Sequence, residues 1–139
     1  MTLIQDSAAI RAIAKNAKRV AVLGIKTEDA GSQPAFYVPQ TLAQHGVEIV
    51  PIPVYYPNVT HILGQPVFRK VSDVPGEIDI LDVFRKPSDL MEHVPDIVAK
   101  KPRVVWLQSG IRSAEFVAAM TEAGIDVVED HCLMVEHGR

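Results

Sequence analysis

Four short segments of this sequence combine residue types that suit the binding of a phosphorylated ligand. Each follows an apolar run, three contain a lysine or arginine, and two contain a glycine beside the predicted start of a helix. Cationic side chains and the free N–H groups at a helix start bind phosphate oxygens, and nearby apolar side chains enclose a base. The residues that we predict to contact such a ligand are Gly24, Ile25, Lys26, Pro53, Val54, Phe84, Arg85, Lys86, Gln108, Ser109, Gly110 and Arg112.

Several of these residues also have a purely structural explanation. Arg85 directly follows a nearly apolar strand, where a charge usually requires a partner, so it either contacts the ligand or pairs with Asp82 or Asp89. Gly24 either admits the ligand or marks close packing of the strand against a helix. Lys26 lies in a loop rich in acids and is as readily a solvated surface lysine. The sequence leaves these alternatives open.

Strands and helices alternate along the chain, which indicates the elements that position these segments. Apolar runs predict strands over residues 20–24, 47–52, 67–71, 78–84, 104–107 and 125–128. Helices are predicted from a cap at Asp6 or Ser7, from Pro34 to Gly46 with an interruption at Pro39, over 90–98 with a break at Pro95, and over 112–123. Residues 129–139 are predicted to be a polar tail. The pattern indicates one domain over 1–139 with an α/β fold: a Rossmann-like, doubly wound, mainly parallel sheet of five to six strands flanked by helices.

The sequence departs from the dinucleotide-binding pattern at two places. In folds of this class the ligand lies outside the carboxyl ends of the strands, where NAD-binding proteins have G-x-G-x-x-G after the first strand and an acid after the second. Here Val20–Gly24 is not followed by further glycines at that spacing, and residues 50–55 contain no acid. The nearest acid, Glu48, is at the start of its strand. We therefore expect a nucleotide-like ligand other than NAD.

The composition limits the class of protein and its partners. The chain has 139 residues, 47% hydrophobic and 22% charged, and a formal net charge of −3, which argues against nucleic acid. No apolar run approaches the roughly 20 residues that span a bilayer, and no signal pattern precedes the first predicted helix. The single cysteine excludes an internal disulfide. We expect a soluble protein of the cytoplasm.

Catalytic and metal-binding signals are weak. The five histidines lack the spacing of a metal site, and no nucleophile motif or phosphate-binding Walker motif is present. His131 stands beside Cys132, but sequence neighbours rarely face one another, so an idle thiol is the simpler interpretation. We therefore predict no metal site and no catalytic residue.

Six segments, taken with their order and spacing, resemble a known family. They cover about residues 15–137, and the second half of the chain supplies the two most specific ones, DVFRKP and VWLQSGI. The segments are VAVLG (20–24), HGVEIVPIPV (45–54), ILGQPVF (62–68), DVFRKPSD (82–89), VVWLQSGI (104–111) and EAGIDVVEDHCLMVEH (122–137). The chain resembles the small stand-alone coenzyme A (CoA)-binding proteins. Their domain is similar to the CoA-binding domain of the succinyl-CoA synthetase α-subunit and of acyl-CoA synthetases.

This resemblance implies a Rossmann-like sheet that binds CoA across its carboxyl edge. It implies that Gly24 and the loop with Lys26 approach the diphosphate, that the Pro53-Val54 segment borders the adenosine, and that Phe84 and Arg85 line the groove. By the same resemblance Gln108, Ser109 and Gly110 lie under the diphosphate or the start of the pantetheine. The remaining domains of the synthetases have no counterpart in this sequence, so we expect no ligase activity from the chain alone.

Three hypotheses follow. We favour a non-catalytic protein that binds CoA or an acyl-CoA, acting as a homodimer or as the partner of a separate enzyme subunit. The alternatives are a dinucleotide-binding regulatory protein and a small enzyme that acts on a CoA thioester through His131 or Cys132.

Overall fold

Five parallel strands form the central sheet of the protein, in the order β2-β1-β5-β6-β7. The structure is a computed structural model and describes residues 2–139. The strands are Arg19–Leu23 (β1), Glu48–Ile52 (β2), Ile80–Val83 (β5), Val104–Leu107 (β6) and Asp126–Val128 (β7). From β1 the chain moves outward to β2, and it then returns to the other side of β1 to form β5, β6 and β7. This reversal between β1 and β5 confirms the predicted doubly wound α/β sheet.

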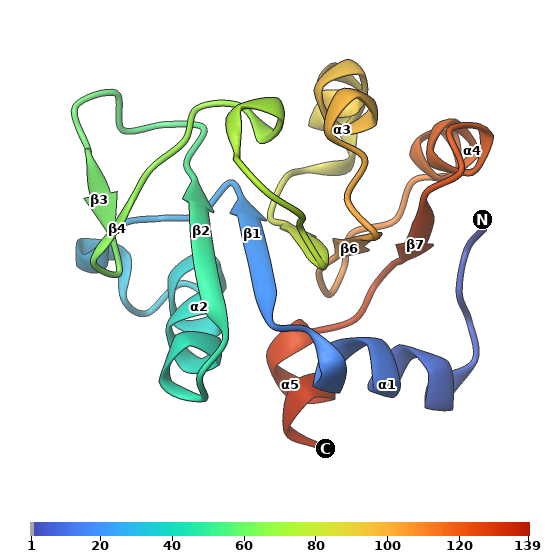
Figure 1. Cartoon of the computed structure of the whole chain (residues 1–139), viewed down its shortest axis with the longest axis horizontal. Coiled ribbons are helices and arrows are strands. Elements are labelled where there is room, and N and C mark those ends of the chain that lie inside the picture. Colours follow the sequence, from blue (N-terminus) through green and yellow to red (C-terminus); the bar gives the residue numbers. More distant parts are fainter. Residues whose placement is uncertain (1) are drawn as a thin grey trace.

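Helices cover both faces of the sheet. α1 (Ser7–Asn16), α2 (Pro34–Gln44) and α5 (Leu133–Gly138) pack on one face, and α3 (Val94–Lys100) and α4 (Ala114–Glu122) on the other. Figure 1 shows the first three below the sheet and the other two above it. Alternate side chains of each strand fill the two interfaces, since successive residues point to opposite faces. Within residues 2–139, no helix combines the length and apolar character needed to cross a membrane.

Helix α2 contains a proline without being interrupted by it. Pro34 begins the helix as predicted, and the helix continues through the buried Pro39 to Gln44. A proline has no N–H to donate to the carbonyl four residues earlier, which here is that of Ala35. The backbone N–H of Lys26 donates to the Ala35 carbonyl oxygen over 3.1 Å instead. The proline therefore leaves an acceptor that holds the loop between β1 and α2 against the helix.

The predicted strand over residues 67–71 is wrong. The chain forms a two-stranded antiparallel ladder just before it, from His61–Ile62 (β3) and Gln65–Pro66 (β4). Val71 begins a 3-10 turn, η2 (Val71–Asp73), because the Asp96 carboxylate accepts the backbone N–H groups of Val71 and Ser72. A side chain of α3 thus takes the place of a neighbouring strand.

The prediction of a polar tail over residues 129–139 is also wrong in part, because α5 lies within it. Leu133 is only 1% exposed and packs on the face shared with α1 and α2. Leu133 and Glu136 are the buried residues of this short helix, and Val135 is exposed. So short a helix depends on its tertiary contacts rather than on its own sequence.

One polar group lies inside the sheet. Asp82 on β5 is completely buried between Val22 and Trp106 of the neighbouring strands. Neither of its carboxyl oxygens has a hydrogen-bond partner among residues 2–139. Burial raises the pKa of Asp82 well above its ordinary value, since the interior disfavours the charged form.

Candidate functional site at the carboxyl edge of the sheet

A pocket of about 310 Å³ opens at the carboxyl edge of the sheet. It lies where β1, β5 and β6 end, beside the reversal of the winding direction, which is the usual ligand position in this class of fold. No acidic side chain is among the described residues that line it. These residues are Lys26, Gln33, Pro34, Ala35, Tyr37, Phe84, Gln108, Ser109, Ile111 and Cys132. The pocket therefore offers a cation and polar groups set among apolar walls.

The structure brings four of the predicted site residues together in this pocket. Lys26 follows β1, Phe84 follows β5, and Gln108 and Ser109 follow β6. The side chain of Lys26 is half-buried, and it has no hydrogen-bond or ion-pair partner among residues 2–139. An unpaired cation at a pocket without acids favours an anionic ligand.

Gly24 is required by the backbone next to this pocket. Its φ is +86°, and a Cβ at this position would overlap with the carbonyl oxygen of Phe84. Its N–H donates to the carbonyl oxygen of Ile52 over 2.9 Å. Gly24 therefore packs against the end of β5, a neighbouring strand, rather than against a helix, and so sets the distance between the β1 loop and Phe84.

Gln108 connects the end of β6 to the start of α5. The residue is 4% exposed, and its Oε1 accepts the backbone N–H of Leu133 over 3.0 Å. Trp106, two residues earlier, donates from Nε1 to the carbonyl oxygen of His131 over 2.8 Å. The side chains of Trp106 on β6 and of Gln108 directly after it thus hold residues 131–133 at the pocket.

Arg85 lies outside the pocket, on a separate part of the same edge. Its side chain is only 8% exposed, and its Nη2 is 3.6 Å from a carboxylate oxygen of Asp89. Its Nε donates to Nε2 of His93 over 3.1 Å, and the guanidinium lies 5.7 Å from the ring centre of Tyr55. Burial and the Arg85 charge lower the pKa of His93. Of the two internal partners predicted for Arg85, the structure shows Asp89 and not Asp82.

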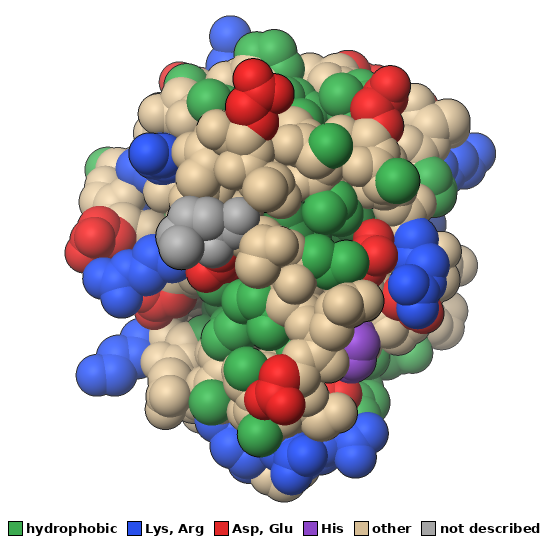
Figure 2. Space-filling model, turned by 90° about the vertical axis from the view of Figure 1, so that its right-hand side faces the viewer, with side chains coloured by type: hydrophobic (Ala, Val, Ile, Leu, Met, Phe, Trp, Pro, Cys, Tyr) green, Lys and Arg blue, Asp and Glu red, His purple; other side chains and the backbone are tan. Residues whose placement is uncertain are grey.

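Arg112 and Gly110 are held by acids of the chain itself. Asp130 accepts the N–H of Gly110 over 2.7 Å, and its other oxygen lies 2.9 Å from Nη2 of Arg112. The Gly110 N–H and the Arg112 guanidinium lower the pKa of Asp130. Arg112 lines a different hollow with Leu3 and Val117, on the face where Figure 2 shows hydrophobic side chains among charged ones.

The other predicted residues do not face the pocket. The side chain of Ile25 is 1% exposed and belongs to the core under α2, and Pro53 is buried at the end of β2. Val54 packs on the opposite core, and Lys86 is exposed. The side chain of Ile25 is thus part of the fold rather than of the pocket lining.

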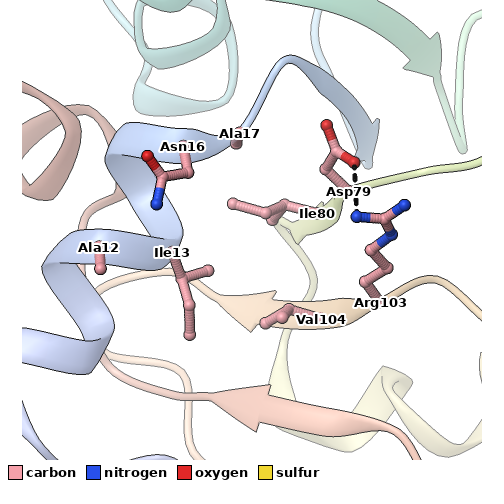
Figure 3. A pocket seen from close by; sticks show the side chains of 8 residues that line it. All are labelled: Ala12, Ile13, Asn16, Ala17, Asp79, Ile80, Arg103 and Val104. Atoms are coloured by element: carbon pink, nitrogen blue, oxygen red, sulfur yellow. Dashed lines mark ion pairs between the residues drawn. The ribbon is translucent and has the colours of Figure 1, made fainter.

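A second hollow of similar size, about 280 Å³, lies at the amino edge of the sheet. Figure 3 shows it between the end of α1 and the starts of β5 and β6, with Asp79 and Arg103 facing each other across 3.9 Å. The Asp79 carboxylate also accepts the backbone N–H groups of Lys18 and Arg19. The charged side chains of this hollow, Asp79 and Arg103, are therefore already paired with one another.

Three polar residues of the carboxyl-edge pocket were not among the predicted binding residues, although Cys132 was considered as a reactive group. Gln33 and Tyr37 come from the start of α2, and Cys132 from the segment before α5. Gln33 and Tyr37 flank the predicted first helical residue, so the position of Pro34 was the available signal. For Cys132 the signal was its place beside His131, but its position at the pocket was not predicted because α5 was not predicted.

Residues 2–139 contain no group of three or more His, Cys, Asp or Glu side chains placed to hold a metal ion. The pocket itself offers ammonium, amide, hydroxyl and thiol groups together with its apolar walls.

Comparisons with known proteins give the family and the fold of the chain. The chain is similar to the protein called cell-free ID.343 from Thermus thermophilus, with 44% identity, 97% of this chain and 98% of that one covered, and a TM-score of 0.86. It is 28% identical to the uncharacterized protein YneT of Bacillus subtilis, over 95% of this chain and 94% of the relative. An acetyl-CoA synthetase of Ca. Korarchaeum cryptofilum shares the fold, with 20% identity, a TM-score of 0.67, and 81% of this chain and 25% of that one covered. The family model described as CoA binding domain matches residues 18–138, and the chain therefore belongs to the CoA binding domain family.

Proposed function

We propose that the protein binds CoA or an acyl-CoA without acting on it, with the ligand across the carboxyl edge of the sheet. The observation that carries this proposal is the convergence of Lys26, Phe84, Gln108 and Ser109 on one pocket in a chain of the CoA binding domain family. Three separate segments supply these residues. Membership of the family supports CoA as the ligand, and the pocket supports the carboxyl edge as the place where it binds.

The pocket suits part of CoA rather than all of it. A volume of about 310 Å³ is at the lower end for ligand pockets, and CoA is a long molecule. Lys26 can pair with a phosphate, the amide of Gln108 can donate to a carbonyl oxygen, and Phe84 and Ile111 offer apolar contact to the pantetheine chain. We therefore place the pantetheine end in this pocket, with the nucleotide along the rest of the edge.

Tyr55 is the candidate contact for the adenine. In Rossmann-like sheets the adenosine lies across the end of the second strand, and Tyr55 follows β2 with 63% of its surface exposed. Arg85 lies under its ring and orients it. An exposed aromatic ring held by a buried cation is a suitable surface for a base to stack on.

The site lacks the arrangement of an activated nucleophile. The Nδ1 of His131 is 2.7 Å from the carbonyl oxygen of Glu129, which can only accept, so this nitrogen donates. Within residues 2–139, Cys132 has no hydrogen bond to a base that could take its proton. This supports binding rather than turnover of a thioester.

Thermal unfolding with a panel of ligands tests the proposal. The panel is CoA, acetyl-CoA, dephospho-CoA, NAD, NADP and ATP. A ligand at about 100 times its Kd adds about 2.7 kcal/mol, or roughly 8 °C for a domain of this size. We expect this shift with the CoA species and a smaller one or none with the others.

Three results would contradict the proposal. The absence of a shift with any CoA species would exclude CoA as the ligand. A shift confined to NAD or NADP would favour a dinucleotide-binding regulator. Release of free thiol from acetyl-CoA above the rate in buffer would contradict the non-catalytic role.

A further inference from the structure

The single cysteine of the chain lies in the wall of the carboxyl-edge pocket. Cys132 is a free thiol, partly exposed, and lines the pocket together with Lys26, Phe84 and Gln108. It directly precedes α5, whose first residue is fixed by Gln108. Cys132 is therefore held at the pocket by the fold.

A second, independent feature of the same pocket points to a ligand beside this thiol. Gln108 is 96% buried, which follows from its exposure of 4%, and only the Oε1 of its amide is engaged, by Leu133. Its Nε2 has no acceptor among residues 2–139 and is not one of the fully enclosed atoms, so it remains open to an acceptor. Gln108 lines the pocket, so an acceptor in the pocket can pair with its free amide group, and Cys132 adjoins the residue that Gln108 holds.

From these two features we infer that Cys132 exchanges disulfides with the ligand: it takes up one CoA moiety from CoA disulfide as a mixed disulfide. This inference rests on the proposed binding of CoA, whose reactive end is itself a thiol. A pantetheine chain that accepts the N–H groups of Gln108 through an amide carbonyl brings its sulfur to the wall that contains Cys132. The pocket would then be a site of covalent modification as well as of binding.

The exchange is balanced and needs no further oxidant. Cys132 loses its thiol proton to solvent, and its sulfur attacks one sulfur of CoA disulfide. The bond between the two CoA sulfurs breaks, a bond between Cys132 and one CoA forms, and the other CoA leaves as a thiolate that takes up a proton. A reducing thiol reverses the step.

Binding accounts for the selectivity of the reaction. A disulfide held in the pocket reacts as if it were present at millimolar local concentration. Oxidised glutathione has the same reactive group and no nucleotide, so it reacts only at its bulk concentration. At equal micromolar concentrations we therefore expect CoA disulfide to modify the protein at least tenfold faster than oxidised glutathione.

Intact-protein mass spectrometry on the full chain tests the inference. The protein is incubated with CoA disulfide or with oxidised glutathione, and the fraction carrying an adduct is followed with time. Desulfo-CoA, which has the whole ligand except its thiol, is added as a competitor, and Cys132→Ser is the matched control. We expect a single CoA adduct, slowed by desulfo-CoA, removed by dithiothreitol and absent from the variant.

The melting shift with CoA is measured on the natural protein and on Cys132→Ser. This measurement distinguishes a failure of the proposed CoA binding from a failure of the proposed disulfide exchange. If CoA shifts both and CoA disulfide is no faster than oxidised glutathione, the exchange is wrong and the binding stands. Adduct formation that desulfo-CoA does not slow leads to the same conclusion. If CoA shifts neither protein, binding and exchange are both wrong.

Discussion

The two edges of the sheet carry hollows of nearly equal size, about 310 Å³ at the carboxyl edge and about 280 Å³ at the amino edge, yet they differ in chemistry. At the amino edge Asp79 pairs with Arg103, and Arg19 pairs with Glu48 at 2.8 Å. At the carboxyl-edge pocket the side chain of Lys26 has no partner among residues 2–139, and the side-chain nitrogen of Gln108 is unused.

This difference shows which property of a hollow identifies a binding site. A cavity whose polar groups already satisfy one another gains little from a ligand, because a ligand only replaces one set of contacts by another. A cavity with donors left over gains new charge-assisted contacts. The unused donors, rather than the volume, therefore support the carboxyl edge as the proposed binding site. Variants at matched positions of the two edges can test this.

The largest effect is expected for Gly24→Ala at the carboxyl edge. The new Cβ meets the Phe84 carbonyl oxygen at a φ of +86°, so we expect a loss of about 3 kcal/mol in the free energy of unfolding. Gly124→Ala, before β7 at the amino edge, has a φ of +77° and open space around the Cβ, so it should lose only about 1–2 kcal/mol. Urea unfolding of both variants makes the comparison. Equal losses would show that the approach of Gly24 to β5 is not tight.

A pH effect is expected from Asp82, which lies inside the sheet between the two edges. Its pKa is raised in the folded protein by burial. Above the ordinary carboxyl pKa, near 4, the unfolded chain releases this proton while the folded protein retains it. The free energy of unfolding should therefore fall as the pH rises from about 4 toward the raised pKa. Urea unfolding between pH 4 and 8 should show this fall in the natural protein relative to Asp82→Asn. Parallel curves for the two proteins would mean that Asp82 is not protonated in the fold.

A tenfold effect on binding is expected for Lys26→Ala. Loss of a charge-assisted contact to a phosphate should weaken CoA binding about tenfold, or about 1.4 kcal/mol, without a change in stability. Arg103→Ala removes a charge of the same sign at the amino edge and should leave the affinity unchanged. Calorimetric titration with CoA compares the two. Equal losses would mean that general charge attraction, and not the pocket, explains the effect.

The smallest effect is expected for Pro39→Ala. The new N–H would compete with the N–H of Lys26 for the Ala35 carbonyl oxygen and loosen the β1–α2 loop. We expect CoA affinity to fall about twofold to threefold, with helix α2 intact by circular dichroism. An unchanged affinity would show that this loop does not depend on that hydrogen bond.

The sequence predicted the parts of the fold that depend on local pattern. Apolar runs located the five strands of the sheet, Asp6 caps α1 as predicted by accepting the N–H of Ala9, and Pro34 begins α2. The family resemblance is confirmed by the family model over residues 18–138. These features are encoded within a few residues of where they occur.

The rest depends on contacts between distant residues. Helix α5 requires Gln108, 25 positions before Leu133, and Arg112 is held by Asp130, 18 positions later. The orientation of the Ile25 side chain is set by its packing in the core under α2. The sequence located the four segments at the carboxyl edge, but which of their side chains contact a ligand stays a prediction.

The link between Gln108 and α5 has a consequence for how the protein is made. A ribosome delivers Lys26 and Gln33 early and Cys132 late, and α5 packs against α1, the first helix of the chain. The growing polypeptide can form the sheet as far as β6 while this wall of the pocket is still missing. For the proposed function this means that a chain synthesised only as far as β6 lacks one wall of the CoA pocket, because Cys132 and α5 come later.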